Sequence, residues 1–198
     1  MIKQSLLAKF ISFFYSKHEF KIVQFNFNKS NLSFFPADKD QLICSLLQTP
    51  DLPLIKEMFG DKKAEQFRNQ MKHSTGYLIF DRYGVIGYAW VSHSTPQNNL
   101  LYLDHVEMEN FAYLYEMYIM PEKRSQQAEY KLFNFMVREL YKQKIHCLIL
   151  KVLKTNLLFY RIIKKMEGTE LGYLTNKRYL WHKTTECKEK KEAISLHY

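Results

Sequence analysis

An uninterrupted apolar run over residues 112–120 constrains the fold of this 198-residue chain more than any other stretch. The residues of the run are apolar or aromatic except for one acid, Glu116. A run of this length and composition is typical of a buried central strand. Pro121 follows directly, and because proline has no N–H to give to a neighbouring strand, we predict that the strand ends there.

The segment after the proline is predicted to be a charged turn, residues 122–124, and then an amphipathic helix. Apolar residues recur there at roughly helical spacing; they are Leu132, Phe133, Phe135, Met136, Val137 and Leu140. The first N–H groups of a helix have no partner within the helix, so a helix that follows a strand can bind an anion at its N-terminus. The sequence therefore predicts an anion site at this turn.

Strand, proline, arginine, turn and helix in this order resemble the acyl-CoA-binding core of the GNAT superfamily of N-acyltransferases. That family has the pattern Arg/Gln-x-x-Gly-x-Gly/Ala directly after its fourth strand. The matching stretch here is Arg124-Ser125-Gln126-Gln127-Ala128-Glu129. The arginine is in place, whereas the two glycine positions hold Gln127 and Glu129. The order of elements around the motif extends the resemblance over residues 18–183.

Periodicity and turn residues predict the other elements. Residues 2–17 are predicted to be an amphipathic helix. A second helix is predicted to begin near Asp38, its possible cap, and to include residues 42–47. Residues 76–81 and 85–92 flank a Gly-containing turn and are predicted to be a β-hairpin. Further helices are predicted over 53–59, 62–72 and 157–166, and strands over 20–27, 145–153, 168–174 and 178–182, with 100–106 either a strand or an insertion.

Together these elements predict an α/β (α+β) fold with a GNAT-like, mostly antiparallel mixed sheet flanked by helices. The strands at 112–120 and 145–153 are joined through a helix, which favours a parallel pair in the centre of the sheet. The resemblance implies that this pair splays apart. We divide the chain into an N-terminal helix (1–17), a GNAT-like acyltransferase domain (18–183) and a charged tail (184–198), which we expect to fray.

The net charge of +9 comes from the part of the chain that follows the apolar run. Residues 121–183 hold 14 basic and 5 acidic residues, whereas residues 1–120 hold 12 of each. A basic half favours an anionic partner, such as a nucleotide-containing substrate or an acidic carrier protein; a solvated basic surface is the alternative. Nucleic acid is disfavoured, because the aromatic residues follow strand patterns instead of alternating with the basic ones.

Three cysteines, Cys44, Cys147 and Cys187, are widely spaced and form no CxxC pair. They predict neither a disulfide framework nor a metal site, and they fit a reducing, cytoplasmic location. The helix at 2–17 is too short to span a bilayer, and no small-residue cleavage site follows it. It either packs on its own domain or makes a peripheral contact with a membrane or a partner, and a homodimer is left open.

The resemblance implies where an acyl thioester would bind. The splay is placed at residues 116–120 and 147–151, with N–H groups near Ile119 and Met120 facing the thioester. Arg124 and the start of the helix would hold the pyrophosphate; these helix residues are Ser125, Gln126, Gln127, Ala128 and Glu129. The implied donor is acetyl-CoA or a longer acyl-CoA. Because Glu129 would repel a diphosphate, acyl-phosphopantetheine on an acidic acyl carrier protein is the alternative.

Glu116 is the candidate general base, because burial in an apolar strand should raise its pKa. A structural ion pair with a nearby Lys or Arg is the alternative. Tyr160 is the candidate acid for the leaving thiolate, since Ile163 holds the place of the family's tyrosine; core packing is the alternative. Asn156 resembles the asparagine that opens the family's next motif and is a candidate for donor binding.

Two other groups of titratable residues are given structural roles. Asp104, His105 and Glu107 form an acid–base cluster that we assign to a loop surface, and His146 is assigned to the start of a strand. The resemblance to the GNAT superfamily implies an N-acyltransferase that moves an acetyl or longer acyl group to a primary amine on a small molecule, a sugar or a peptide. The alternative is an inactive GNAT-like domain that binds an acidic partner.

Overall fold

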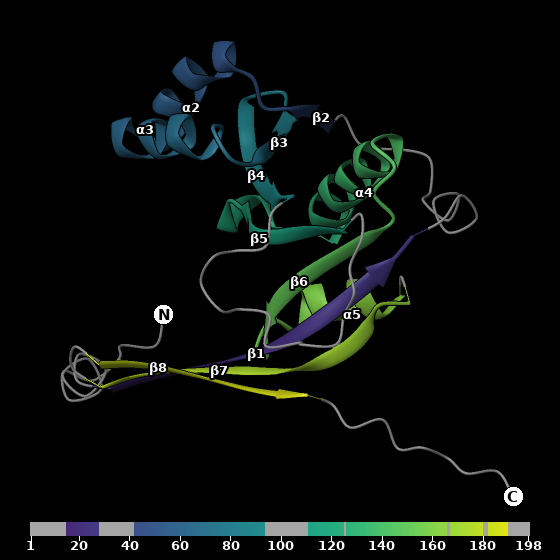
Figure 1. The fold of residues 1–198 in the computed structure, drawn as a ribbon. Helices are drawn as coiled ribbons and strands as arrows, with labels where there is room; N and C mark the ends of the chain where they lie inside the picture. The colour runs from purple at the N-terminus through teal and green to yellow at the C-terminus, as the bar shows by residue number, and fades with distance from the viewer. Residues whose placement is uncertain are drawn as a thin grey trace, which may run out of the picture.

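One mixed sheet organises the described part of the chain (Figure 1). The computed structural model describes residues 15–27, 42–93, 111–124, 126–165, 167–179 and 182–189. The strands lie in the order β2-β3-β4-β5-β6-β1-β7-β8. Their bounds are β1 (Tyr15–Asn26), β2 (Ile43–Leu46), β3 (Thr75–Asp81), β4 (Gly84–Ser92), β5 (Phe111–Ile119), β6 (Cys147–Leu153), β7 (Thr169–Tyr179) and β8 (His182–Glu189). Strands β5 and β6 pair in parallel and the other neighbours are antiparallel, which confirms the predicted sheet class.

Helices cover both faces of this sheet (Figure 1). They are η2 (Thr49–Asp51), α2 (Leu52–Phe59), α3 (Asp61–Gln70), η3 (Pro121–Lys123), α4 (Gln126–Lys142) and α5 (Leu157–Lys165). Helices α4 and α5 pack over one face, where Phe133 and Phe159 join a large core with Val23 and Leu148. Helices α2 and α3 cover β3 to β5 on the other face, in a cluster centred on Trp90. We call these the α4–α5 face and the α2–α3 face.

The predicted helix over residues 42–47 is wrong, because residues 43–46 form strand β2. The spacing of Leu42, Ile43, Leu46 and Leu47 suits a helix, but the burial follows a period of two. Leu42, Cys44 and Leu46 pack against the core of the α4–α5 face, while Ile43 is 66% exposed. Cys44 therefore packs against the core, although the helical pattern did not include it among the apolar residues.

The C-terminal strands also differ from their predicted bounds. Residues 178–182 do not form a separate strand, since β7 continues to Tyr179 and β8 begins at His182. Residues 184–189, which we expected to fray, pair with β7 in strand β8, and residues 15–17 lie in β1 and not in a helix. Because these segments are polar, they carry no hydrophobic periodicity that would predict a strand. They join the sheet through backbone pairing with their neighbours.

Most of the remaining elements agree with the sequence prediction, including both helices before β3, the β3–β4 hairpin and the path from β5 through α4 to β6. Several predicted features lie outside the described residues: the first part of the predicted helix (residues 2–14 of 2–17), Asp38, the segment 100–106, and the cluster of Asp104, His105 and Glu107. Among the helices that the structure describes, none has an apolar stretch long enough to cross a bilayer.

Candidate active site

The parallel ladder between β5 and β6 ends partway along both strands. It begins with Phe111 opposite Cys147 and ends with Leu114 opposite Leu150. Beyond that rung the two strands share no pair among the described residues, although β5 continues to Ile119 and β6 to Leu153. In Figure 1 the strands diverge toward the left of the view. An opening therefore lies between their C-terminal halves.

A β-bulge in β5 marks the start of this opening. Val91 of β4 lies opposite Leu114, but Trp90 lies opposite Glu116, so Tyr115 is an extra residue in the ladder. A bulge bends its strand and increases the local twist, which carries β5 away from β6. The bulge also shifts the alternation of side chains. It therefore places Glu116 on the α2–α3 face instead of the α4–α5 face, where Leu114 packs.

The backbone of β5 directs N–H groups into the opening. Met120 donates its N–H to the carbonyl oxygen of Ile86 on β4, at 2.8 Å. Because successive N–H groups point to opposite sides of a strand, Ile119 and Met117 direct theirs away from β4 and toward β6. Of the two backbone positions singled out from the sequence, Ile119 thus faces the opening, whereas the N–H of Met120 is bonded within the sheet.

The β6 side of the opening begins later than predicted. Residues 147–150 belong to the ladder and do not border the opening, so only Lys151 of the predicted segment 147–151 does. The predicted β5 segment, 116–120, lies beyond the last shared rung, although β5 itself ends at Ile119. The difference arises because the register of β6 depends on where α4 returns the chain to the sheet, and hydrophobic pattern does not fix that point.

Two side-chain contacts hold the turn that follows β5. Lys123 Nζ lies 2.7 Å from Oδ2 of Asp81 at the end of β3. Arg124 donates its Nε–H to the carbonyl oxygen of Ile119, at 3.1 Å. The guanidinium group of Arg124 is therefore folded back to the end of β5, beside the opening.

The first turn of α4 carries an acid in place of the family's glycine. The helix begins at Gln126, Gln127 is exposed and Ala128 is buried, while Ser125 lies outside the described residues. Glu129 has its Oε2 buried without a hydrogen-bond partner among the described residues. Burial raises the pKa of Glu129 above its ordinary value. The first turn thus holds a carboxylate that is poorly solvated.

Glu116 lies in a hydrogen-bonded cluster on the α2–α3 face. Tyr88 donates its hydroxyl to Oε1 at 2.7 Å, and Lys63 Nζ lies 3.0 Å from the same oxygen. Gln70 donates its Nε2–H to Oε2 at 3.3 Å. Burial alone would raise the pKa of Glu116, but these three hydrogen bonds and the charge of Lys63 outweigh it and hold the pKa below its ordinary value. The predicted rise is therefore wrong, and the ion-pair alternative describes the arrangement.

Solved structures of other proteins share this architecture, whereas no family profile and no curated protein matches the sequence. A GCN5-related N-acetyltransferase-like protein from Streptococcus suis matches with a TM-score of 0.57 and 9% identity, over 88% of this chain and 66% of that chain. Aminoglycoside N-acetyltransferase AAC(6')-Iy in complex with CoA matches with a TM-score of 0.50 and 11% identity, over 69% and 93%. A Drosophila protein matches with a TM-score of 0.55 and 12% identity, over 83% of this chain and 52% of that chain.

This chain has a GNAT-like fold. It spans about half of the Drosophila chain and about two thirds of the Streptococcus chain. At these identities the likeness concerns the fold alone.

The GNAT-like fold separates the two residues that the sequence proposes for catalysis. Tyr160 on α5 donates its hydroxyl to Oε2 of Glu170 on β7, at 2.6 Å. Lys21 of β1 places Nζ 3.1 Å from the same oxygen and 3.8 Å from the centroid of the Tyr160 ring. Strand β6 lies between these strands and β5. The structure therefore gives Tyr160 a polar network of its own and does not bring it to Glu116.

Asn156 caps a helix. Its Oδ1 accepts the N–H of Phe159 at 3.2 Å, in the first turn of α5. Such a cap satisfies an N–H that has no partner within the helix, so its position is explained without a ligand. His146 is exposed, and its ring lies 5.0 Å from that of Tyr141.

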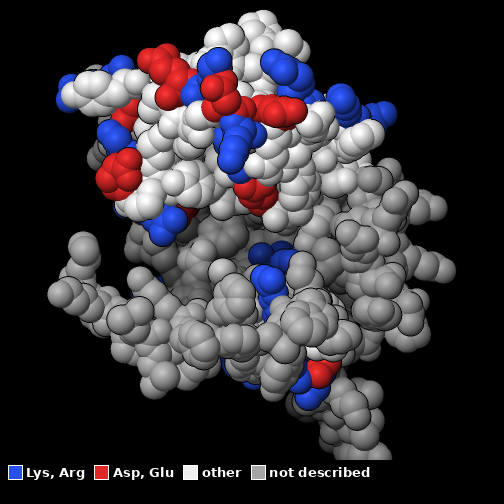
Figure 2. Space-filling view, turned by 90° about the vertical axis from the view of Figure 1, so that its left-hand side faces the viewer, with Lys and Arg blue, Asp and Glu red and all other residues white. Residues whose placement is uncertain are grey.

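Sequence reasoning missed Lys63, Gln70 and Tyr88, which surround Glu116. They became neighbours of Glu116 only through the packing of α3 on β4 and β5, for which the sequence gives no spacing rule. It also missed the lysine at the edge of the opening, Lys151. Figure 2 looks at the side on which β5 and β6 diverge, and Lys or Arg side chains are visible there.

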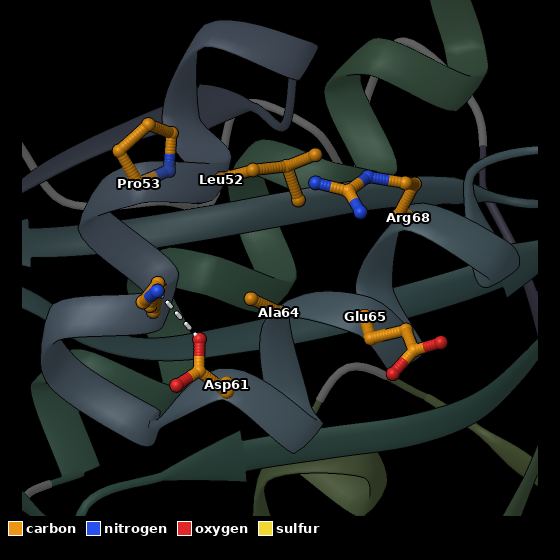
Figure 3. A pocket seen from close by; sticks show the side chains of 7 residues that line it. Leu52, Pro53, Asp61, Ala64, Glu65 and Arg68 are labelled. Carbon is orange, nitrogen blue, oxygen red and sulfur yellow. Dashed lines mark ion pairs between the residues drawn. The ribbon is translucent and has the colours of Figure 1, made fainter.

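A separate pocket lies between α2 and α3 (Figure 3). Lys56 and Asp61 form an ion pair across one side of it, with Nζ and Oδ1 2.7 Å apart, and Arg68 reaches toward Leu52 from the other side. The pocket is open and mixed in charge. In the described part of the chain, no group of three or more His, Cys, Asp or Glu side chains is placed to hold a metal ion.

Proposed function

We propose that this GNAT-like protein is an N-acyltransferase that moves an acyl group from acetyl-CoA or a longer acyl-CoA to a primary amine. The observation that carries the proposal is the opening between β5 and β6, into which Met117 and Ile119 direct N–H groups. The likeness to a CoA-bound acetyltransferase fold supports it. The free cysteines Cys44 and Cys147 fit the reducing cytoplasm that we propose as the location.

The donor would bind along the open edge of β5. The pantetheine arm of an acyl-CoA contains amide groups, and an extended chain with amides pairs with a free strand edge as an added strand does. The N–H groups of Met117 and Ile119 suit that pairing. An N–H aimed at the thioester carbonyl also stabilises the negative charge that develops there during attack. Both functions require only the backbone, which explains why sequence motifs identify this site poorly.

The diphosphate of CoA fits the first turn of α4 less well. Arg124 and the N–H groups at residues 127 and 128 favour an anion at a helix N-terminus. The carboxylate of Glu129 opposes it. This observation favours a second donor, an acyl-phosphopantetheine arm on an acidic carrier protein, because that arm has one phosphate and the protein surface supplies the other charges. Asn156, as the cap of α5, is not needed for either donor.

Glu116 is the proposed partner of the acceptor amine. Its carboxylate lies next to the bulge on the α2–α3 face, and its depressed pKa keeps it ionised at neutral pH. An ionised carboxylate attracts the ammonium form of an amine, orients it, and accepts a proton directly or through a water as the amine attacks. The donors Tyr88 and Lys63 fix the position of the carboxylate but also weaken it as a base.

A catalytically inactive GNAT-like domain remains the other class of function. The substitution of both motif glycines by Gln127 and Glu129 is the observation that favours it. A domain of this kind would bind a thioester or an acidic partner without turnover.

Two measurements on the purified protein test the proposal. Calorimetry with CoA and acetyl-CoA reports donor binding, and release of free thiol during incubation with acetyl-CoA and a panel of amines reports transfer. We expect binding and amine-dependent thiol release. Binding without thiol release for any amine would support the inactive domain, and neither signal with CoA or with acyl carrier protein would contradict both donors.

A further inference from the structure

Lys151 is the first residue of β6 beyond the last rung that β6 shares with β5. It lies directly opposite Ile22 of β1, and directly opposed residues have their side chains on the same face of a sheet. Ile22 shares a hydrophobic cluster with Tyr115, which also packs under α2 and α3. Lys151 therefore lies at the edge of the opening and on the α2–α3 face, the same face as Glu116.

The charge of Lys151 is not matched by a carboxylate within the described residues. Its Nζ lies 4.6 Å from the centroid of the Phe20 ring, which is a cation–π contact. The side chain is half-buried, and burial lowers the pKa of its ammonium group. A cation that is partly removed from water costs free energy unless an anion pairs with it.

Glu116, the acid of β5 beside the opening, is already neutralised by another group. Glu116 accepts from Lys63 at 3.0 Å, and both of these side chains lie on the α2–α3 side of β5. Leu153, the next residue of β6 on the same face as Lys151, is 40% exposed and lies opposite Phe20. Beside the opening, β6 and β1 thus combine an apolar surface with a cation, Lys151, that has no carboxylate partner among the described residues.

We infer that Lys151 binds a carboxylate or phosphate of the substrate and so selects substrates that carry an anionic group close to the reacting centre. This inference rests on the proposed function. The anion has two possible sources: an acceptor that carries both an amine and an acidic group, or the acyl chain of a dicarboxylic half-thioester. Because β5 and β6 no longer pair beyond Leu114 and Leu150, an acceptor that reaches from Glu116 to Lys151 must span more than the roughly 5 Å between paired strands.

The experiment compares the wild type with Lys151→Met and Lys151→Arg. Lys154→Met serves as the control, because Lys154 follows β6 closely but is exposed and paired with Glu19 at 3.3 Å. Each protein is assayed with acceptor pairs that differ only in an acid or its methyl ester, and with acetyl-CoA against succinyl-CoA. We expect Lys151→Met to lower kcat/KM at least ten-fold for the anionic member of one pair and less than two-fold for the neutral member.

If Lys151→Met loses the preference for the charged acceptor, the anion belongs to the acceptor. If it loses the preference for succinyl-CoA over acetyl-CoA, the anion belongs to the acyl chain. Lys151→Arg should retain part of the preference, and Lys154→Met all of it. Equal losses for the charged and neutral members would overturn the inference, and so would an unchanged preference.

A second readout does not depend on turnover. Succinate titrated into the wild type should shift the side-chain NMR signal of Lys151, and the same titration should leave Lys151→Met without this response. An unmoved Lys151 signal would contradict the inference even if acyl transfer is observed. A moved signal without thioester binding would contradict the proposed function and leave the anion site supported.

Discussion

Lys63 on α3 holds its ammonium group 3.0 Å from Oε1 of Glu116 on β5. The contact joins the helical layer to the strand that borders the opening, and both side chains are mostly buried, with 22% and 29% of their side-chain surfaces exposed. It fixes an ionised carboxylate next to the bulge at Tyr115. Glu116 is therefore a positioned anion with a low pKa, and not the isolated acid with a high pKa that its apolar strand suggests.

Replacement of Glu116 by Gln should lower kcat by about 10² to 10⁴, the range for loss of a positioned base. Donor affinity should change little, because Glu116 lies on the α2–α3 face, where we propose that the acceptor binds. Since its pKa lies below the ordinary value, Glu116 is ionised throughout the neutral range. The wild-type rate should therefore rise with pH as the amine loses its proton, without a second inflection from Glu116.

The control for this variant is Glu65→Gln, which removes an exposed acid from α3 and should leave kcat unchanged. Steady-state kinetics across the neutral pH range provide both comparisons. If Glu116→Gln retains the wild-type kcat at every pH, the carboxylate only supports the packing of α3 on β5.

Replacement of Glu129 by Gln should strengthen the binding of CoA. Two like charges roughly 5 Å apart repel by about 3 kcal/mol at an effective dielectric near 20, before water and salt screen them. After screening we expect a gain of about 1 kcal/mol in calorimetry. Because the pKa of Glu129 is raised, wild-type CoA binding should also improve as the pH falls toward that pKa, and the variant should lose this dependence.

The same variant should raise the melting temperature at pH 7. A carboxyl group whose folded pKa is raised destabilises the fold above that pKa, and it has no effect below its unfolded value, about 4.3. The stabilisation by Gln should therefore disappear near pH 4. Weaker CoA binding by Glu129→Gln would show that Glu129 assists the donor, which would favour the carrier-protein arm.

Gly87 of β4 lies opposite Ile119, at the end of β5. A Cβ added there would lie 2.5 Å from both Cδ1 of Ile119 and the carbonyl oxygen of Tyr118. The backbone oxygen cannot move without displacing β5, so Gly87→Ala should destabilise the fold by about 1–3 kcal/mol. Denaturant unfolding measures the loss. Gly87→Ala should also weaken donor binding, because it displaces the end of β5 beside the opening. Val85→Ala, at a buried site on the same strand, is the control and should lower stability without this loss of donor binding.

Tyr160→Phe should affect stability and not the rate. The variant removes one of the donors to Glu170, which keeps Lys21, so the expected cost is about 0.5–1.5 kcal/mol. The hydrogen bonds and the charge of Lys21 outweigh burial and lower the pKa of Glu170 to about 2. The carboxylate thus stabilises the fold above its unfolded pKa, and this contribution is lost as the pH falls from about 4 toward 2.

Acid unfolding of Glu170→Gln tests whether the ionised carboxylate of Glu170 stabilises the fold. Its stability should lie below that of the wild type at pH 7 and converge with it near pH 2. A large loss of kcat in Tyr160→Phe, with the stability unchanged, would restore Tyr160 as the acid for the leaving thiolate.

The apolar run at residues 112–120 and the helix after Pro121 were sufficient to predict the centre of the fold. Both depend on local burial patterns, which repeat along one element. The outer strands were harder to predict. Strand β2 has only 4 residues, too few to distinguish its period-of-two burial from helical spacing, and the outer parts of β7 and β8 carry mostly polar side chains. Domain boundaries at residues 17 and 183 stay a prediction.

The sequence predicted an opening beside Glu116, but not the surroundings of that residue. Glu116 was found because it is the one acid in its strand, yet its pKa depends on Lys63, Gln70 and Tyr88, which come from other elements. The bulge at Tyr115 has no sequence signature here, although it decides which face Glu116 takes. The same holds for Lys151, whose importance follows from the register of β6.

Backbone amide NMR with acetyl-CoA tests the central claim most directly. The claim is that the thioester binds in the opening between β5 and β6. We expect the amide signals of Met117 and Ile119 to shift on titration, while the signal of Met120, which is bonded to Ile86, shifts much less. Shifts confined to the pocket between α2 and α3, or no shift at Met117 and Ile119 at saturating acetyl-CoA, would contradict it.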